Sequence, residues 1–342
     1  MFREVLENLC RRQDLTADEA AAAMQDVMDG RASPAQISAL LMGLAMKGER
    51  PSELVGLART MRARAVALPE RAGPVFDLCG TGGDRAGTFN ISSVAAVVTA
   101  AAGVCVAKHG NRAVSSACGS ADMFEALGVR TSVSPATVAV CLDGAGIAFL
   151  LAPDFHPSMR HAGPVRRELG LRTAFNLLGP LTNPAEPARQ LVGVPRPELT
   201  ELIARALLSL GSDRAWVVHG ADGLDEISTT GYSKVSECRN GTVSTFYVHP
   251  SDFGLPVASV AALAGGTPAE NAAIALDILK GTRGAARDAV LLNAGAALFV
   301  ADRTASVSDG VALAAAAIDR GLALETLNRL VALSTTEHGA AS

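Results

Sequence analysis

The chain changes its hydrophobic pattern near Pro74, and this change limits the folds that it can adopt. Up to about residue 70, apolar residues recur at helical spacing. After Pro74, short apolar runs alternate with longer helical stretches. Segments in β-α-β-α order form a mostly parallel sheet with helices on both faces. We therefore predict an α/β fold, with a small helical domain at residues 1–71 and a larger α/β domain at residues 72–342.

The second pattern predicts the elements of the sheet in chain order. We expect strands at residues 75–79, 104–107, 147–151, 191–194 and 215–218. The helices between them are expected at residues 92–102, 120–127, 135–144 and 198–210, and the last third of the chain is expected to add further helices. The interval 157–187 is rich in Arg, Pro and Gly and lacks a clear strand, so it could cross back to join the helical domain.

The helices before residue 70 have explicit start signals. Thr16 and Glu19 form a capping box, in which each side chain satisfies a free backbone amide of the other residue. Ser33 and Gln36 repeat this device, and Gly48 is placed to end the helix that follows. The apolar faces of these helices would pack on another domain or on a second subunit.

The composition excludes some classes of partner. Hydrophobic residues make up 49% of the chain and charged residues 19%, as in soluble globular proteins. The formal net charge of -4 provides no general basic field for nucleic acid. A local cluster could still bind a small polyanion, and its members are Arg160, Arg166, Arg167 and Arg172.

The chain also carries few signs of export or of a membrane location. Its six cysteines contain no Cys-x-x-Cys pair, which favours reduced thiols. The first residues include acids where a signal peptide would be positively charged. The longest weakly polar stretch, residues 94–107, is shorter than the roughly 20 apolar residues that cross a bilayer. We expect a cytoplasmic protein.

A glycine-rich segment, residues 80–84, follows the first predicted strand. Consecutive glycines can turn backbone amides toward an anion, and Asn90, Ser92 and Ser93 supply further donors at the start of the next helix. A tight structural turn would use the same glycines, and ordinary N-capping would use one of these polar side chains. The segment alone leaves both interpretations open.

The loop at residues 108–122 is expected to come directly off the second strand and is dense in hydrogen-bond donors. Such a loop suits a phosphate, and we expect Lys108, Asn111 and Ser120 to contact it. A solvated polar connection is the alternative. His109 could act on a proton or simply bond within the loop, and the residues do not decide between these roles.

Asp225 and Glu226 lie just after the strand predicted at 215–218. Ligands of open α/β folds bind at the carboxyl ends of the strands, and proteins hold Mg²⁺ with one or two carboxylates plus substrate phosphates. An adjacent acidic pair is also common on exposed loops. Together with the glycine segment, the pair points to a metal-held phosphate.

Taken together, these segments resemble the anthranilate phosphoribosyltransferase family in order and spacing. The resemblance covers nearly the whole chain. Its motifs are residues 80–84, 108–112, 119–122, 156–157, 163–166, 172–173, 175–184, 222–226 and 271–272.

The resemblance implies transfer of the phosphoribosyl group of phosphoribosyl pyrophosphate to the amine of anthranilate, the second step of tryptophan synthesis from chorismate. It implies that Mg²⁺ is held by Ser92, Asp225 and Glu226, and that a homodimer forms through the N-terminal helices. The implied contacts to phosphoribosyl pyrophosphate are Gly80, Thr81, Gly82, Gly83, Asp84, Thr88, Asn90, Ile91, Ser92, Ser93, Lys108 and Ser120. The implied contacts to anthranilate are Gly80, His109, Asn111, His156 and Arg166.

The chemistry of Arg166 suits its implied role, because a planar guanidinium can bind a carboxylate through two parallel hydrogen bonds. No residue is assigned as a general acid or base, although His109 is a candidate. Two alternatives remain open. One is an enzyme like pyrimidine nucleoside phosphorylase, which would need no metal-bound diphosphate, and the other is a nucleic-acid-binding paralogue, which would carry a basic groove and lose the acidic pair.

Overall fold

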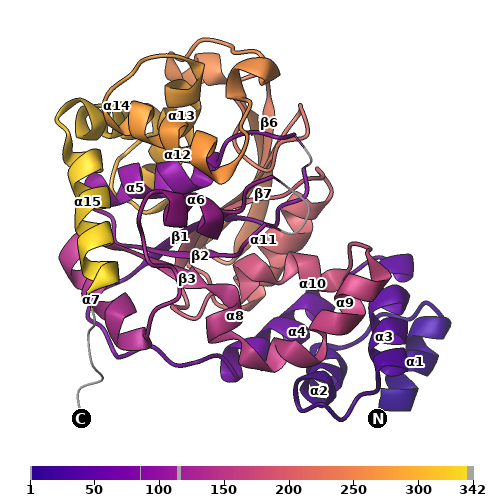
Figure 1. Ribbon diagram of the computed structural model, residues 1–342. Helices are drawn as coiled ribbons and strands as arrows, with labels where there is room; N and C mark the ends of the chain where they lie inside the picture. Colours follow the sequence, from indigo (N-terminus) through magenta and orange to yellow (C-terminus); the bar gives the residue numbers. More distant parts are fainter. Residues whose placement is uncertain (1, 85, 114–116, 337–342) are drawn as a thin grey trace.

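The computed structural model describes residues 2–84, 86–113 and 117–336, and in this part of the chain a central seven-stranded sheet is surrounded by helices (Figure 1). The strand order is β3-β2-β1-β4-β5-β6-β7. The first five strands in that order run parallel and the last two pair antiparallel. The predicted α/β fold with a mostly parallel sheet is confirmed.

The five parallel strands lie close to the predicted positions. They are β1 (Phe76–Gly80), β2 (Val106–Gly110), β3 (Ile147–Leu151), β4 (Arg189–Gly193) and β5 (Arg214–Gly220). The boundary of β2 was predicted wrongly. Its pairing with β3 runs from Val106 to Gly110, so Lys108 and His109 belong to a buried strand and not to the loop after it.

The hairpin of β6 (Ser233–Arg239) and β7 (Thr242–Val248) was not predicted. Most residues of β7 are exposed or half-buried, so the strand lacks a continuous apolar run. The turn between the strands did carry a signal, because Asn240 and Gly241 have φ values of 51° and 77°. An Asn-Gly pair with positive φ at both residues is typical of a two-residue β-hairpin.

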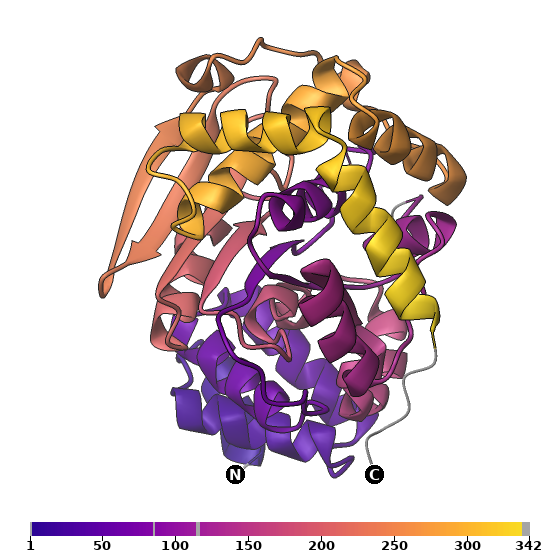
Figure 2. The same cartoon turned by 90° about the vertical axis from the view of Figure 1, so that its left-hand side faces the viewer.

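The N-terminal helices form where their caps predict. They are α1 (Phe2–Cys10), α2 (Ala17–Met28), α3 (Pro34–Lys47) and α4 (Pro51–Ala63). The capping boxes at Thr16 and Ser33 are both present, and Gly48 closes α3 with its amide bonded to the Leu44 carbonyl. In Figures 1 and 2 these helices gather at one end of the molecule, away from the C-terminal helices.

The interval that follows β3 returns to these helices as short helical turns. They are α8 (Ala152–Phe155), η1 (Pro157–His161), α9 (Gly163–Leu169), α10 (Ala174–Leu177) and η2 (Gly179–Leu181). Helix α9 packs on α3, and α10 contacts α3 as well. Val165 and Phe175 are buried in the same hydrophobic cluster as Leu40 and Leu44.

The two faces of the sheet bury different partners. Successive residues of one strand, such as Trp216 and Val217, join two separate hydrophobic clusters, because neighbouring side chains of a strand point to opposite faces. The cluster of Val217 continues through α11 (Leu199–Ser209) into the N-terminal helices. The cluster of Trp216 is covered by α5 (Ile91–Ala101), α12 (Pro268–Leu279), α13 (Ala285–Val300), α14 (Val307–Asp319) and α15 (Leu322–Thr335).

Helices α6 (Ser120–Ala126) and α7 (Pro135–Ala145) complete the crossovers beside β2 and β3. Among the described residues, no helix has both the length and the apolar character that crossing a membrane needs.

Candidate active site

The carboxyl ends of β1 and β5 bring the two predicted anion and metal segments together. The Asp225 carboxylate accepts a hydrogen bond from the Gly82 amide at 2.9 Å, and the Glu226 carboxylate accepts one from the Ser92 amide at 3.0 Å. The contacts join residues 143 and 134 positions apart in the chain. The acidic pair is therefore not a solvated loop feature, because both acids face the glycine segment and the start of α5.

The approach of Asp225 depends on glycine at two strand ends. A Cβ atom on Gly80 would lie 2.5 Å from a carboxylate oxygen of Asp225, and one on Gly193 would lie 1.5 Å from its backbone oxygen. Real Cβ atoms do not approach oxygen this closely, so a larger residue at either position would displace the acid. These glycines give Asp225 room between β1 and β4.

Both acids are half-buried, and the loss of contact with water affects their protonation. It raises the pKa of Asp225 to about 7, with the charge of Asp84 adding to the effect, and it raises the pKa of Glu226 to about 8, with the charge of Asp225 adding. Lys108 opposes the shift at Glu226. A buried carboxyl with a raised pKa binds a proton or a cation in preference to remaining charged and alone.

The donor set fits a divalent cation that is completed by a ligand. Carboxylate and hydroxyl oxygens are the atoms that Mg²⁺ prefers, and Asp225, Glu226 and Ser92 provide them. Among the described residues, no cluster of three or more His, Cys, Asp and Glu side chains could hold a metal alone. Phosphate oxygens would have to supply the remaining positions.

The glycine segment is shaped for an anion. Gly82 and Gly83 have φ values of 66° and 85°, which favour glycine, and the Thr81 amide is tied to the Gly193 carbonyl at 2.9 Å. Asp84 accepts a bond from the Ala86 amide at 3.3 Å, and Thr88 forms a bridge with Ala264.

Helix α5 begins at Ile91, and the residue before it, Asn90, does not cap the helix with its side chain. The Asn90 side chain makes no capping bond; it accepts from the Asn271 amide group at 2.9 Å and donates to the Cys118 carbonyl. Ile91 is buried as the first helical residue, and the Ser93 hydroxyl is buried with no hydrogen-bond partner in the described part of the chain. The amides of Ile91, Ser92 and Ser93 all have partners, so this helix end offers a ligand its partial positive charge and the Ser93 hydroxyl.

Lys108 and His109 project to opposite faces of β2. The Lys108 ammonium is buried and donates to the Leu78 carbonyl at 2.5 Å, while its charge also acts on Asp77 and Glu226. The expectation that Lys108 lies in a donor-rich loop was wrong, because it is a buried residue of β2 itself. Its contact with a phosphate remains a proposal.

His109 and His156 form a buried pair with ring centroids 5.5 Å apart. His109 donates from Nδ1 to the Gly179 carbonyl at 3.0 Å, and His156 donates from Nε2 to the Thr182 carbonyl at 2.9 Å. Burial, and then His156, lowers the pKa of His109 to about 3, and burial lowers the pKa of His156. Both rings are therefore neutral, and the second nitrogen of each is a buried acceptor without a partner among the described residues.

The remaining loop residues meet just beyond β2. The Ser120 hydroxyl donates to the Asn111 carbonyl at 3.3 Å, and the Asn111 side chain accepts from the Arg112 amide at 2.8 Å. Positions 114–116 of the predicted donor loop lie outside the described residues.

Arg166 lies on α9 with its guanidinium 5.7 Å from the centre of the Phe175 ring. The side chain is half-buried, and burial lowers its pKa. No hydrogen bond or ion pair joins its guanidinium to another residue that the structure describes. A partly desolvated arginine of this kind is suited to the carboxylate of a ligand.

Comparison with known proteins places the chain in a family. One family model, described as the helical bundle domain of a glycosyl transferase family, matches residues 3–65, and a second, described as its a/b domain, matches residues 72–324. The anthranilate phosphoribosyltransferase of Moorella thermoacetica is 54% identical over 97% of this chain and 98% of the relative. The chain belongs to the anthranilate phosphoribosyltransferase family.

Solved anthranilate phosphoribosyltransferases have the same fold. The structure from Thermus thermophilus has a TM-score of 0.92 at 44% identity, covering 97% of this chain and 99% of that one. The enzyme from Saccharomyces cerevisiae, in complex with PRPP and Mg, has a TM-score of 0.89 at 26% identity and covers 98% of both chains. Neither the phosphorylase alternative nor the nucleic-acid-binding alternative is favoured by these relatives.

Sequence reasoning on the anthranilate phosphoribosyltransferase motifs left Arg172 without a role of its own. The structure places its guanidinium on the glycine segment, where it donates to the Gly82 carbonyl and, at 3.4 Å, to the Thr81 carbonyl. The sequence signal was its membership of the arginine cluster together with its place in a family motif. Arg160 and Arg167 of that cluster are exposed and make no such contact.

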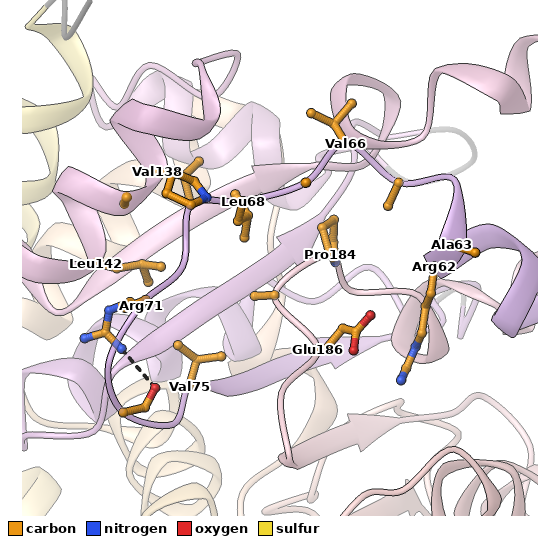
Figure 3. Close-up of a pocket in the computed structure, with 16 residues that line it drawn as sticks. Arg62, Ala63, Val66, Leu68, Arg71, Val75, Val138, Leu142, Pro184 and Glu186 are labelled. Carbon is orange, nitrogen blue, oxygen red and sulfur yellow. Dashed lines mark hydrogen bonds between the residues drawn. The ribbon is translucent and has the colours of Figure 1, made fainter. Parts of the chain in front are cut away.

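A cavity of about 480 Å³ lies away from this site (Figure 3). It is lined by the linker between α4 and β1, including Val66 and Leu68, and by Pro184 and Glu186 just before β4. Arg71 at one end of it donates to the Gly73 carbonyl at 3.4 Å. The cavity adjoins the amino ends of the strands, so it is separate from the acidic pair at the carboxyl ends.

Proposed function

We propose that this chain transfers the phosphoribosyl group of phosphoribosyl pyrophosphate to the amine of anthranilate and releases pyrophosphate. The observation that carries the proposal is the meeting of Asp225 and Glu226 with the amides of Gly82 and Ser92 at the carboxyl edge of the sheet. Together with the family membership, this arrangement supports a metal-assisted diphosphate site in the tryptophan pathway.

The reaction requires the protein to neutralise the negative charge of the leaving diphosphate. Displacement at the ribose C1 builds positive charge on the sugar ring and negative charge on pyrophosphate, so positioned donors and cations lower the barrier. In our proposal residues 80–83 and 90–93 surround the phosphates, and Asp84, Thr88, Lys108 and Ser120 extend this set. Mg²⁺, held by Ser92, Asp225 and Glu226, would supply charge neutralisation at the diphosphate when bound.

The acceptor would bind on the side of α9. Arg166 is proposed to bind the anthranilate carboxylate, with Asn111, Gly80, His109 and His156 completing the contacts. Because both histidines are neutral and have an unpaired acceptor nitrogen, either could accept a hydrogen bond from the amine. The amine is itself a nucleophile, so no covalent intermediate is required.

The organisation of the protein in solution is part of the proposal. We infer a helical domain at residues 1–71 that is joined by residues 157–187, supported by the packing of α9 on α3. A homodimer through the N-terminal helices is proposed, and the exposed Met46 of α3 is consistent with such an interface. A cytoplasmic location is proposed with it.

The test is the loss of anthranilate fluorescence when phosphoribosyl pyrophosphate and Mg²⁺ are both present. We expect turnover with the complete mixture and none when either compound is left out. Circular dichroism on the same sample shows that the protein is folded. Folded protein that consumes no anthranilate under these conditions contradicts the proposal.

A further inference from the structure

Gly82 of the glycine segment is held from two sides. Asp225 accepts a hydrogen bond from its amide at 2.9 Å, and Arg172 donates to its carbonyl and to that of Thr81. Asp225 follows β5, whereas Arg172 lies between α9 and α10, which pack on the N-terminal helices. Arg172 is thus a contact between the helical side of the molecule and the phosphate-binding segment.

The Arg172 guanidinium also lies against Gly83. A Cβ atom on Gly83 would lie 1.1 Å from Nη1 of Arg172, so the guanidinium occupies the space that any side chain there would need. Arg172 is exposed, so burial of apolar surface does not hold it in place. Its hydrogen bonds to the two carbonyls help to hold it there.

The contact with Arg172 also fixes which way the amides of the glycine segment point. In a planar trans peptide, the carbonyl of one residue points away from the amide of the next. By drawing the carbonyls of Thr81 and Gly82 to one side, Arg172 directs the amides of Gly82 and Gly83 to the other. The first of these amides does face Asp225, where the metal and diphosphate are proposed to bind.

The same stretch of chain also carries the proposed carboxylate-binding residue. Helix α9 ends at Gly170, whose amide bonds to the Arg166 carbonyl at 3.2 Å, and Arg172 follows two residues later. On its other side, the Thr173 amide is bonded to the Asn176 side chain at 3.0 Å, and Phe175 is buried. A shift of α9 would therefore move Arg166 and Arg172 together.

We propose that Arg172 is a positioning residue that couples the diphosphate half of the site to the anthranilate half. This inference rests on the proposed function. When the diphosphate fixes the glycine segment, Arg172 holds α9 in the position in which Arg166 meets the carboxylate. Binding at one half then strengthens binding at the other by the same factor, because such coupling is reciprocal.

The experiment uses Mg²⁺-pyrophosphate and anthranilate, a pair that cannot react. Calorimetry measures the affinity for anthranilate with and without saturating Mg²⁺-pyrophosphate. In the unaltered protein we expect the affinity to rise by about fivefold or more. Arg172→Ala should reduce that factor to about one, while its affinity for anthranilate alone stays within about twofold of the unaltered value.

Three further variants separate coupling from a general structural effect. Arg167→Ala, which changes an exposed arginine of α9, should keep the full factor. Arg172→Lys keeps the positive charge but loses the planar guanidinium that can donate to two carbonyls, so it should retain only part of the coupling factor. Gly83→Ala alone should also lower the coupling factor. Combined with Arg172→Ala it should cause no further loss, because both changes disturb the same contact.

Two results would overturn the inference. One is a coupling factor in Arg172→Ala equal to that of the unaltered protein, and the other is no coupling in the unaltered protein. The fluorescence assay is run first on the unaltered protein, so a failure of the proposed function appears there as absent turnover. If Arg172→Ala does not fold, the Lys and Gly83→Ala variants carry the same test.

Discussion

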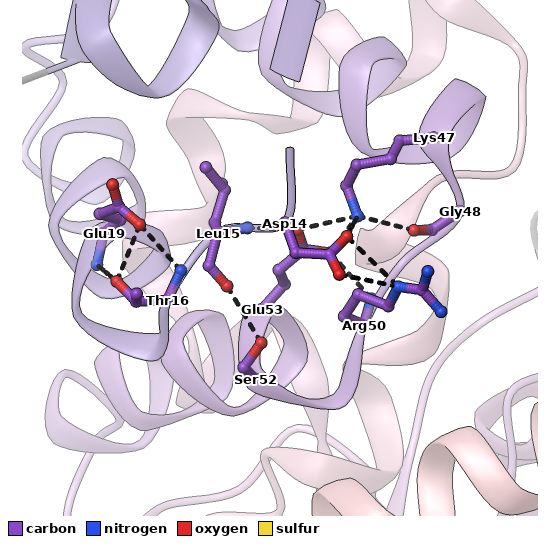
Figure 4. A network of polar contacts seen from close by, with 9 residues as sticks. All are labelled: Asp14, Leu15, Thr16, Glu19, Lys47, Gly48, Arg50, Ser52 and Glu53. Atoms are coloured by element: carbon purple, nitrogen blue, oxygen red, sulfur yellow. Dashed lines mark hydrogen bonds and ion pairs between the residues drawn. The ribbon is translucent and has the colours of Figure 1, made fainter. Parts of the chain in front are cut away.

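Two regions of this molecule shield acids from water, Glu53 completely and the pair Asp225 and Glu226 in part, and they satisfy these acids differently. In the N-terminal helices, Glu53 is fully buried and accepts hydrogen bonds from the amides of Leu15 at 2.9 Å and Arg50 at 2.8 Å (Figure 4). Its carboxylate also pairs with the buried ammonium of Lys47 at 3.0 Å, and Asp14 adds a second acid to that ammonium at 2.9 Å. Every strong interaction that Glu53 needs comes from the protein.

The acids at the edge of the sheet lack that support. Asp225 and Glu226 each accept one bond from a distant backbone amide, and no ion pair with Lys or Arg joins either acid within the described part of the chain. Burial raises the pKa of both. The difference teaches that a fully buried acid with internal partners supports the fold, whereas a half-buried acid without a cationic partner marks a place for a ligand.

The largest expected effect comes from removing the charge of the acidic pair. Asp225→Asn combined with Glu226→Gln keeps the oxygen acceptors for the two amides but removes the metal charge partners, so the rate should fall by on the order of 10²–10³. Initial rates by anthranilate fluorescence measure this, and circular dichroism should show an intact fold. Asp277→Asn, an exposed acid on α12, is the control and should keep the full rate. Equal rates for the double variant and the control would contradict the claim that Asp225 and Glu226 serve a ligand.

Glu53 should give the opposite result, with a loss of stability and no loss of catalysis. Glu53→Gln leaves Lys47 buried with less compensation, and breaking a buried pair typically costs about 3–5 kcal/mol. Chemical denaturation measures the free energy of unfolding, and rates per folded molecule should be unchanged. Asp14→Asn, at the exposed rim of the same network, should destabilise much less. If both variants lower the free energy of unfolding by the same amount, the burial of Glu53 does not set it apart from Asp14.

Arg166 extends the comparison to a cation, because within the described part of the chain no acid pairs with its guanidinium. We expect this guanidinium to bind the carboxylate of a ligand. Arg166→Ala should raise the KM for anthranilate by about 10–100-fold, as expected for a lost hydrogen bond to a charged group, and raise the KM for phosphoribosyl pyrophosphate much less. Steady-state kinetics with each substrate varied separates the two. A larger effect on phosphoribosyl pyrophosphate would assign Arg166 to the other half of the site.

The smallest effect concerns His109, a buried base without a counter-charge. Its pKa is lowered to about 3 in the folded protein, whereas an unfolded histidine titrates near 6.5. The unfolded state therefore binds the proton first, so stability is complete above about pH 6.5 and declines as the pH falls toward 3. His109→Gln should remove up to about 2 kcal/mol of the stability lost between pH 6.5 and 5.

The measurement for His109 is chemical denaturation at a series of pH values. An unaltered slope in His109→Gln would mean that this ring is not held neutral.

Local signals in the sequence predicted much of this structure, and the wrong boundary of β2 occurs where distant segments decide. Thr16 and Ser33 cap their helices because a capping box needs only four neighbouring residues. Lys108 and His109 are strand residues because carbonyls of Leu78 and Gly179, far away in sequence, satisfy them in a buried position. The polar character of these two residues alone resembles a loop.

The site could be predicted in part for the same reason. The acidic pair and the glycine segment each follow a strand, so the rule for parallel sheets brings them to one edge. Arg172 lies in the irregular interval between α9 and α10, where no periodicity states which way a side chain points. Its contact with Gly82 depends on how the short helices pack on α3, and no local pattern records that packing.

The most direct test of the central claim is metal binding by the acidic pair. Mn²⁺ in place of Mg²⁺ can be followed by electron paramagnetic resonance, in which bound ions lose the sharp signal of the free ion. With phosphoribosyl pyrophosphate present, the unaltered protein should bind more Mn²⁺ than phosphoribosyl pyrophosphate binds alone, and the folded double variant Asp225→Asn, Glu226→Gln should abolish that excess. Equal excess binding by both proteins would contradict the assignment of these two acids to the metal.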